Sequence, residues 1–236
     1  MTGTAEIPNP PWRRPRKESR RRPLSQGLIV DTAMRILDAD GLDALSMRRV
    51  AQELRTGPAS LYAHVANKGE LLELMIDRVV GEIEVPDPEP ERWQEQIVQA
   101  ARGVHRACTR HRGIARAALA NIPIGPNSLR FAEAVLAILR AGGVPDRSAA
   151  WFLDRLSLYV LADAFEAYVH DERGRRTEED AQHHLSQIGA YYASLPPDRF
   201  PNITSMAAPL ISGDGDDRLA FGVELMIRGL VSYRDR

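Results

Sequence analysis

Cysteine, aromatic residues and long apolar runs are all scarce in this chain of 236 residues. Cys108 is the only cysteine, which excludes an internal disulfide and fits a reducing compartment. No uncharged stretch approaches the ~18–20 apolar residues that cross a membrane, and the N-terminus lacks the apolar core of a signal peptide. We therefore expect a cytoplasmic protein without a membrane partner.

Net charge is nearly absent too, because 31 Lys and Arg residues face 32 Asp and Glu residues, a balance of −1. The total neither indicates nor excludes nucleic acid, but the distribution is uneven. Residues 12–23, WRRPRKESRRRP, hold seven Arg or Lys residues against one Glu. Like charges and prolines cannot collapse into a core, so residues 1–24 are predicted to form a disordered basic arm. The arm is either a solvated tail or a segment that follows DNA phosphates.

Strand patterns are missing as well, because no stretch sustains the period-two alternation of a half-buried strand. Apolar residues instead recur every three to four positions, the spacing of amphipathic helices. The predicted helices cover residues 25–40, 46–54, 58–65, 68–84, 92–110, 112–120, 127–141, 146–171, 178–195 and 215–233. The acidic, proline-rich residues 86–91 end the first module, and residues 198–214 are expected to form a long loop.

Two helices have surfaces that one chain does not easily cover. Residues 151–169 are apolar nearly all round, and such a helix must be covered on more than one side. Gly222 and Gly229 lie seven residues apart, which puts both on one face and lets another helix come close. Burial in a single large core is one explanation. We favour self-association, in which these helices pack against their symmetry mates as a four-helix dimer interface.

The segment TGPASLYAHVANK, residues 56–68, predicts a third helix of about eight residues with Pro58 at its first position. So short a helix is marginal in water by itself. It persists only if Leu61 and Val65 dock on the two helices before it. A supporting helix, a tight turn containing Gly57 and a second helix with a free outer face make a helix-turn-helix.

The outer face of this short helix has residues suited to DNA. Small residues at its start let the backbone approach a groove, and hydroxyls and Lys68 can contact phosphates. Arg48, at the start of the supporting helix, has the reach for a guanine edge. Taken singly, Tyr62 is more often packing and His64 a plain surface imidazole; their ordered combination favours DNA. The predicted DNA-binding residues are Arg48, Pro58, Ala59, Ser60, Tyr62, His64 and Lys68.

With this motif, residues 25–84 closely resemble the TetR/AcrR family of transcriptional regulators. The carrying residues are Leu61-Tyr62-Ala63-His64-Val65-Ala66-Asn67-Lys68, followed by Glu70-Leu71-Leu72. Trp93-Gln94, His111-Arg112 and residues 221–225 are similar to the ligand-binding domain of the tetracycline-repressor branch. The resemblance implies an all-α fold. Its parts are an N-terminal three-helix helix-turn-helix DNA-binding domain, residues 25–70, and a larger helical ligand-binding and dimerisation domain, residues 71–236.

The resemblance also implies a homodimer that binds a palindromic double-stranded operator and answers to a small-molecule effector. In that branch Arg48, Ser60, Tyr62, His64 and Lys68 fall on positions that contact operator DNA. Pro58 and Ala59 replace a glutamine and a proline of the tetracycline repressor. A glutamine base contact is therefore missing, and we expect a different operator sequence.

The ligand site departs further from that branch. Glu84, Ala100 and Val104 replace drug-contacting residues, Val135 replaces a glutamine, and Ala118 replaces a histidine that ligates magnesium. Magnesium needs oxygen ligands and tightly held waters, so we predict no metal, no cofactor and an effector more apolar than tetracycline–magnesium. The expected wall is Val104, Leu119, Phe131, Val135, Trp151, Phe152 and Tyr159. The candidate polar anchors, each of which has plain surface or core as an alternative role, are His105, Asn121, Arg155 and His170.

Two other classes of protein stay open from the residues alone. The first is an all-helical enzyme or small-molecule carrier with a helix-turn-helix-like corner. Against an enzyme, no Glu-x-x-His pair, His-Glu-x-x-His motif or Cys-His cluster occurs in the sequence. The second is a DNA-binding protein without a ligand. We predict a ligand-responsive transcriptional regulator, a repressor, and not an enzyme.

Overall fold

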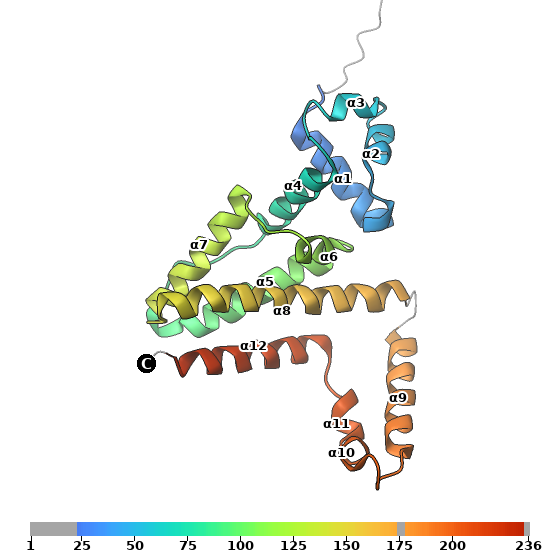
Figure 1. Cartoon of the computed structure of the whole chain (residues 1–236), viewed down its shortest axis with the longest axis vertical. Helices are drawn as coiled ribbons and strands as arrows, with labels where there is room; N and C mark the ends of the chain where they lie inside the picture. The colour runs from blue at the N-terminus through green and yellow to red at the C-terminus, as the bar shows by residue number, and fades with distance from the viewer. Residues whose placement is uncertain (1–22, 174–177, 234–236) are drawn as a thin grey trace, which may run out of the picture.

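The structure is a computed structural model that describes residues 23–173 and 178–233. Residues 1–22 of the predicted basic arm lie outside the described part of the chain. The described residues form helices and their connections, with no strand among them, which confirms the all-α prediction (Figure 1). None of these helices is long and apolar enough to span a bilayer.

The N-terminal helices form a compact head, drawn at the top of Figure 1. It contains α1 (Gln26–Asp40), η1 (Leu42–Ala44), α2 (Met47–Glu53) and α3 (Pro58–Leu61). Ser25 and Ser46 are N-caps, since their hydroxyls accept the backbone N–H of Leu28 and Arg49. An N-cap of this kind satisfies a helix donor that would otherwise lack a partner.

Helix α4 (Lys68–Val80) leads from the head into the body. It starts at Asn67, whose side chain accepts the N–H of Glu70 at 3.0 Å. Leu71 and Met75 are fully buried in a hydrophobic cluster that also contains Leu37 of α1 and Ile114 of the body. The head and the body therefore share one hydrophobic core and are not independent domains joined by a linker.

The body is built mainly from five helices. They are α5 (Trp93–Arg110), α6 (Ile114–Leu119), α7 (Pro126–Ala141), α8 (Asp146–Arg173) and α12 (Gly215–Val231), with η2 (Pro90–Arg92) before α5. Helices α5, α7, α8 and α12 share a second hydrophobic cluster, in which Ile97, Ile138 and Val223 are buried. Gly142 is the C-cap of α7. An added Cβ at this position would lie 2.4 Å from the ring of Trp93.

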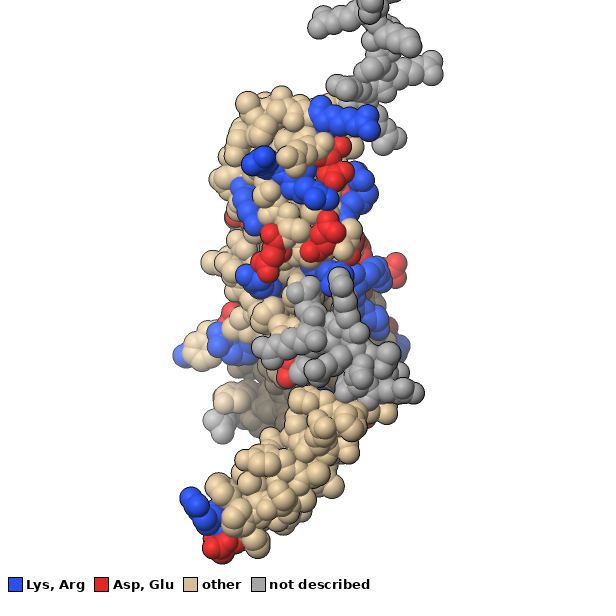
Figure 2. Space-filling model, turned by 90° about the vertical axis from the view of Figure 1, so that its right-hand side faces the viewer, with Lys and Arg blue, Asp and Glu red and all other residues tan. Residues whose placement is uncertain are grey.

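Three further helices project from the body at the lower right of Figure 1: α9 (Glu178–Ser194), α10 (Pro201–Ser205) and α11 (Ala207–Ile211). The predicted loop over 198–214 was therefore wrong. Helices α10 and α11, which lie in that range, have only five residues each, and so short a segment does not show an apolar period. Between residues 182 and 213 only Asp198 and Arg199 are charged, and Figure 2 shows the nearly uncharged surface of this projection.

Other boundaries also differ from the prediction. Helix α4 ends at Val80, with Gly81 as its C-cap, instead of continuing to residue 84. The two glycines of α12 do not share a role. A Cβ on Gly222 would meet Tyr159 of the same chain at 2.1 Å, whereas nothing lies within 4 Å of one on Gly229. Packing within the chain therefore explains Gly222.

Candidate functional site

Helix α3 is held to the head by its inner residues. Leu61 and Val65 are buried, at 0% and 1% exposure, in the cluster that contains α1 and α2. Regular α-helix ends at Leu61, earlier than predicted, and the chain continues as a further turn in which the N–H of Val65 bonds to the carbonyl of Leu61 at 2.9 Å. The amide of Gln26 also donates to the carbonyl of His64 at 3.4 Å. Neighbouring side chains thus replace the stability that so short a helix lacks.

The turn between α2 and α3 contains Gly57, as predicted, but its left-handed residue is a different one. Gly57 has an ordinary φ of −82°, while Arg55 has φ 51°. The left-handed residue of the turn is therefore an arginine, although this conformation favours glycine. The N–H of Thr56 reaches back to the carbonyl of Ala51 at 2.9 Å and closes the turn.

The outer face of α3 is free in this structure. All seven predicted DNA-binding residues are exposed, and Tyr62 is 52% exposed although it is a large aromatic. They come from three elements of the head: Arg48 lies on α2, Lys68 begins α4, and the others lie on α3 or the turn after it. An exposed tyrosine hydroxyl, a serine and two cations are side chains of the kind that contact phosphates and base edges.

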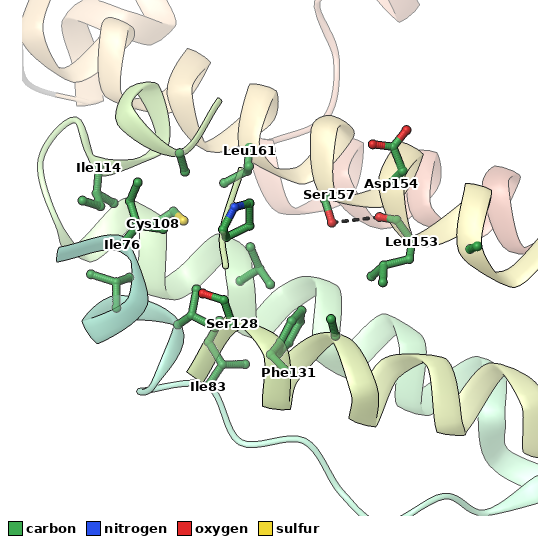
Figure 3. A pocket seen from close by; sticks show the side chains of 17 residues that line it. Ile76, Ile83, Cys108, Ile114, Ser128, Phe131, Leu153, Asp154, Ser157 and Leu161 are labelled. Atoms are coloured by element: carbon green, nitrogen blue, oxygen red, sulfur yellow. Dashed lines mark hydrogen bonds between the residues drawn. The ribbon is translucent and has the colours of Figure 1, made fainter. Parts of the chain in front are cut away.

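A cavity of about 300 Å³ lies between α4 and the helices of the body (Figure 3). Helix α4 gives it Ile76, Val79 and Val80, and Ile83 follows. The rest of the wall comes from α5 to α8, and its polar atoms are few. It consists of Val104, Cys108, Ile114, Ala118, Pro123, Ser128, Phe131, Ala132, Ala150, Leu153, Asp154, Ser157 and Leu161.

Of the predicted ligand-binding residues, Val104 and Phe131 line this cavity. The other apolar ones lie elsewhere. Leu119 is on the surface at the end of α6, Val135 is buried in the second cluster one turn beyond Phe131, and Trp151 is 61% exposed under the guanidinium of Arg147.

Helix α8 explains most of these misplacements. Leu153, Ser157 and Leu161, spaced four residues apart, face the cavity. Phe152, one residue away from this row, is buried in the second cluster. The hydroxyl of Tyr159 donates to the carbonyl of Arg218 at 3.1 Å on the α12 side. Because α8 is apolar nearly all round, its sequence does not reveal which row faces the cavity.

The predicted polar anchors are engaged outside the cavity. His105 pairs with Asp163, with Nε2 3.1 Å from a carboxylate oxygen. Burial raises the pKa of that carboxyl, while His105 opposes the shift. The amide of Asn121 donates to the carbonyl of Ala117 at 2.7 Å, and Arg155 pairs with Asp154 on the surface. The side chain of His170 lies outside the described residues.

Two cavity residues that the sequence reading missed have distinct chemistry. Burial raises the pKa of the Cys108 thiol to about 12, so it is a neutral, apolar part of the wall. Ser128 is buried, and both its N–H and its hydroxyl donate to one oxygen of Asp77, at 2.9 and 3.0 Å. No local sequence signal pairs Ser128 with Asp77, which lies 51 residues earlier.

Asp77 fastens α4 to the start of α7. Its second oxygen accepts from the amide of Asn127 at 3.0 Å. Gly125, the N-cap of α7, has no side chain to cap the helix, and a Cβ there would lie 2.3 Å from the Asp77 carboxylate. A carboxylate from α4 therefore caps α7, where the helix dipole favours negative charge.

This arrangement has counterparts among known proteins. Residues 29–75 match the family described as bacterial regulatory proteins, tetR family, and residues 85–233 match the tetracyclin repressor-like C-terminal domain. The chain belongs to the tetR family. It is a DNA-binding transcriptional regulator with a C-terminal ligand-binding domain, and it is not an enzyme.

Individual relatives agree with this assignment. The chain is 33% identical over 204 residues to the HTH-type transcriptional repressor DrrR1 of Streptomyces coeruleorubidus, covering 86% of this chain and 75% of that one. The crystal structure of apo ActR from Streptomyces coelicolor is 45% identical with a TM-score of 0.82, covering 91% of this chain and 100% of ActR. ActR in complex with actinorhodin is 47% identical with a TM-score of 0.82, covering 89% and 96%.

Proposed function

We propose that this TetR-family regulator is a repressor that acts in the cytoplasm as a homodimer. It occupies a palindromic operator and leaves it when a small, largely apolar effector fills the cavity. One observation carries the proposal: α4 has Lys68 at the exposed edge of the head and Ile76, Val79 and Val80 in the cavity wall. A single helix therefore contributes to both the exposed DNA-binding face around α3 and the wall of the cavity.

For DNA, we propose three roles for the seven exposed residues around α3. Ser60, Tyr62 and Lys68 contact phosphates and set the register, while Arg48 donates to a guanine edge. Pro58, Ala59 and His64 lie where the helix meets the groove. In a dimer, two such helices must enter successive major grooves ~34–36 Å apart.

For the effector, the cavity supports a small, mostly apolar molecule. Its volume of about 300 Å³ is at the small end of the range for ligand sites. Phe131 and the aliphatic side chains present apolar surface, and the hydroxyl of Ser157, which donates to the carbonyl of Leu153 at 2.8 Å, adds a polar atom on the α8 side (Figure 3). ActR, at 47% identity, has been solved with actinorhodin. We therefore propose a polycyclic aromatic effector, and not tetracycline–magnesium.

Release requires that the effector prefer one position of α4 over another. A ligand shifts such an equilibrium only by its differential affinity for the two states, and tenfold weaker operator binding needs ~1.4 kcal/mol of coupling. Movement of α4 changes the separation of the two heads. Contacts with phosphates on successive grooves are then lost together.

For the dimer, exposed apolar residues on α8 and α12 support a second copy as the partner. Phe221 and Leu225 are 64% and 54% exposed, one helical turn apart, and Gly229 continues the same row. The open space around Gly229 leaves room for another helix to approach closely. Trp151 and Leu158 form a similar exposed pair on α8. We propose that α8 and α12 pair with their copies in a four-helix interface.

The experiment is fluorescence anisotropy of the full chain on DNA flanking its own gene, with and without a panel of polycyclic aromatic compounds. Ala132→Trp fills the cavity from α7, and Leu129→Trp, on the exposed side of the same helix, is its matched control. We expect wild type and Leu129→Trp to be released by at least one compound, and Ala132→Trp to bind DNA but resist release.

Other results would contradict parts of this proposal. If no duplex is bound at low ionic strength, the DNA assignment fails. If DNA is bound but no compound affects wild type, the chain is a DNA-binding protein without a ligand of this class. Equal release of both tryptophan variants would place the effector outside this cavity.

A further inference from the structure

The corner after α5 carries a histidine that contacts the head. His111 is buried, and its Nδ1 lies 2.9 Å from a carboxylate oxygen of Asp38 in α1. Its Nε2 lies 3.1 Å from an oxygen of Glu82, just after α4. The other oxygen of Glu82 accepts from Arg110 at 2.8 Å. One imidazole thus joins α1 of the head, the end of α4 and the end of α5.

Both bonds require the charged ring. A carboxylate accepts only, and a neutral imidazole has a single N–H, whereas the protonated ring has two. Asp38 needs a cation for a further reason: it lies in the last turn of α1, at the negative end of the helix dipole, and that turn contains no basic residue. Arg49 serves Asp40 at the same end, at 3.3 Å.

His111 also lies between the cavity and the head. Cys108 and Ile114, three residues before and after it, both line the cavity. Gly113 has φ 80°, which starts α6 from a left-handed residue, and a Cβ there would meet Leu42 of η1 at 3.1 Å. The corner is therefore pressed against the head on one side and continuous with the cavity wall on the other.

Other charged and titratable groups surround the corner from the neighbouring elements. Arg116 of α6 pairs with Asp43 of η1 at 3.0 Å, and Arg78 of α4 pairs with Asp31 of α1 at 3.1 Å, but all four side chains are at least half exposed. Exposed pairs of this kind contribute little. The groups that contact the His111 ring are Asp38 and Glu82; Arg110 and Arg112 adjoin His111 in sequence, and Tyr168 of α8 lies near Gly113.

From these contacts we infer that His111 is a positioning residue: its protonated ring holds the head at a fixed orientation and links that orientation to the cavity wall. When the ring is neutral, it keeps one carboxylate and releases the other, which weakens the link between α1 and the end of α4. The hold on the head is independent of any function, whereas its effect on operator binding rests on the proposed function.

The test is hydrogen exchange of the full chain at pH 6 and pH 8, corrected for the intrinsic rate of each amide. His111→Gln has a single donor nitrogen at both pH values and so cannot replace both ring nitrogens, and Asp38→Asn removes the α1 carboxylate. His183→Gln, exposed on α9, is the control. We expect protection of the second half of α1 to fall at least threefold between pH 6 and pH 8 in wild type and the control. In His111→Gln and Asp38→Asn, the protection of the second half of α1 is already low at pH 6 and does not fall further at pH 8.

Operator anisotropy on the same proteins separates this inference from the proposed function. His64 also lies at the reading face, so the informative quantity is the difference between wild type and His111→Gln, which we expect to be at least threefold at pH 6 and to vanish at pH 8. If hydrogen exchange of α1 depends on His111 but no DNA is bound, the inference that His111 fixes the head is supported and the proposed function fails. A wild-type exchange profile retained by His111→Gln and Asp38→Asn overturns the inference.

Discussion

At the scale of single residues, Cys108 shows how surroundings decide what a side chain can do. Its thiol lies in the cavity wall close to Ile76 and Ile114 (Figure 3). Burial disfavours the thiolate and raises the pKa to about 12. The same cysteine on an exposed loop would be a reactive nucleophile at physiological pH; here it is an apolar surface for a ligand.

We predict that Cys108 resists thiol reagents in the folded protein. With a pKa of about 12 the thiolate fraction at pH 8 is roughly one in ten thousand, against about a quarter for an ordinary thiol. Because the pKa is raised, labelling should still accelerate as pH increases from 8 to 10. Reaction with a chromogenic disulfide measures this, and Ser194→Cys, exposed on α9, is the reactive control. Complete labelling of native wild type within minutes at pH 8 would contradict the burial.

Asp77 is the second residue whose role depends on distant partners. We expect Asp77→Ala to lower the free energy of unfolding by ~2–3 kcal/mol, because Ser128 and Asn127 lose their acceptor and α7 loses its cap. Asp77→Asn keeps an acceptor and should cost less. Urea unfolding gives both values. Asp214→Ala removes the exposed cap of α12 and serves as a control, expected near ~1 kcal/mol. An Asp77→Ala loss no larger than that of the control would show that the α4–α7 contact is unimportant.

At the scale of elements, α3 divides cleanly between an inner face that fixes it and an outer face that is free. Within α3, Ser60 is exposed and Leu61 is fully buried, although the two residues are adjacent in sequence. This division makes stability and DNA binding separable by single substitutions one position apart.

We expect Leu61→Ala to lower the free energy of unfolding by ~2–5 kcal/mol, because Leu61 is fully buried. Ser60→Ala should change stability by less than ~0.5 kcal/mol, as is usual for surface positions, yet weaken operator binding. Thermal unfolding and anisotropy on the same samples test the pair. A stable Ser60→Ala protein with unchanged affinity would remove Ser60 from the DNA contacts.

Elements also show where the sequence reading stopped being accurate. Helices α1 and α2 were predicted to within one residue at each end, because each has one buried face. Helix α8 was predicted almost to its ends, but the row that faces the cavity was not, because the helix is apolar nearly all round. The two five-residue helices α10 and α11 were missed, since a segment of that length contains little more than one period.

At the scale of the whole molecule, the proposed dimer gives a direct prediction. Leu225→Glu places a charge in the exposed apolar row of α12 and should convert the dimer to monomer at micromolar concentration. Ile122→Glu is the matched control, because Ile122 is an apolar residue that is 82% exposed and lies on neither α8 nor α12. Sedimentation velocity distinguishes the two. A dimeric Leu225→Glu protein, or a monomeric wild type, would argue against this interface.

The domain boundary at residue 70 stays a prediction, although the shared core makes its meaning clear. Helix α4 begins at Lys68 and its Leu71 and Met75 are buried with residues from α1. Any cut near that position divides a continuous cluster. The cavity wall and the head therefore meet in the same packed core, which the proposed release of DNA requires.

The sequence by itself determined the helical class, the reading helix and its family, because these depend on local patterns: apolar spacing, caps, and a motif of consecutive residues. Only the tertiary structure decided which side chains meet across the chain. It placed Asp77 of α4 against the start of α7, His111 between Asp38 and Glu82, and one row of α8 against the cavity. Such contacts join residues tens of positions apart, and no periodicity within one helix specifies which neighbour its faces will meet.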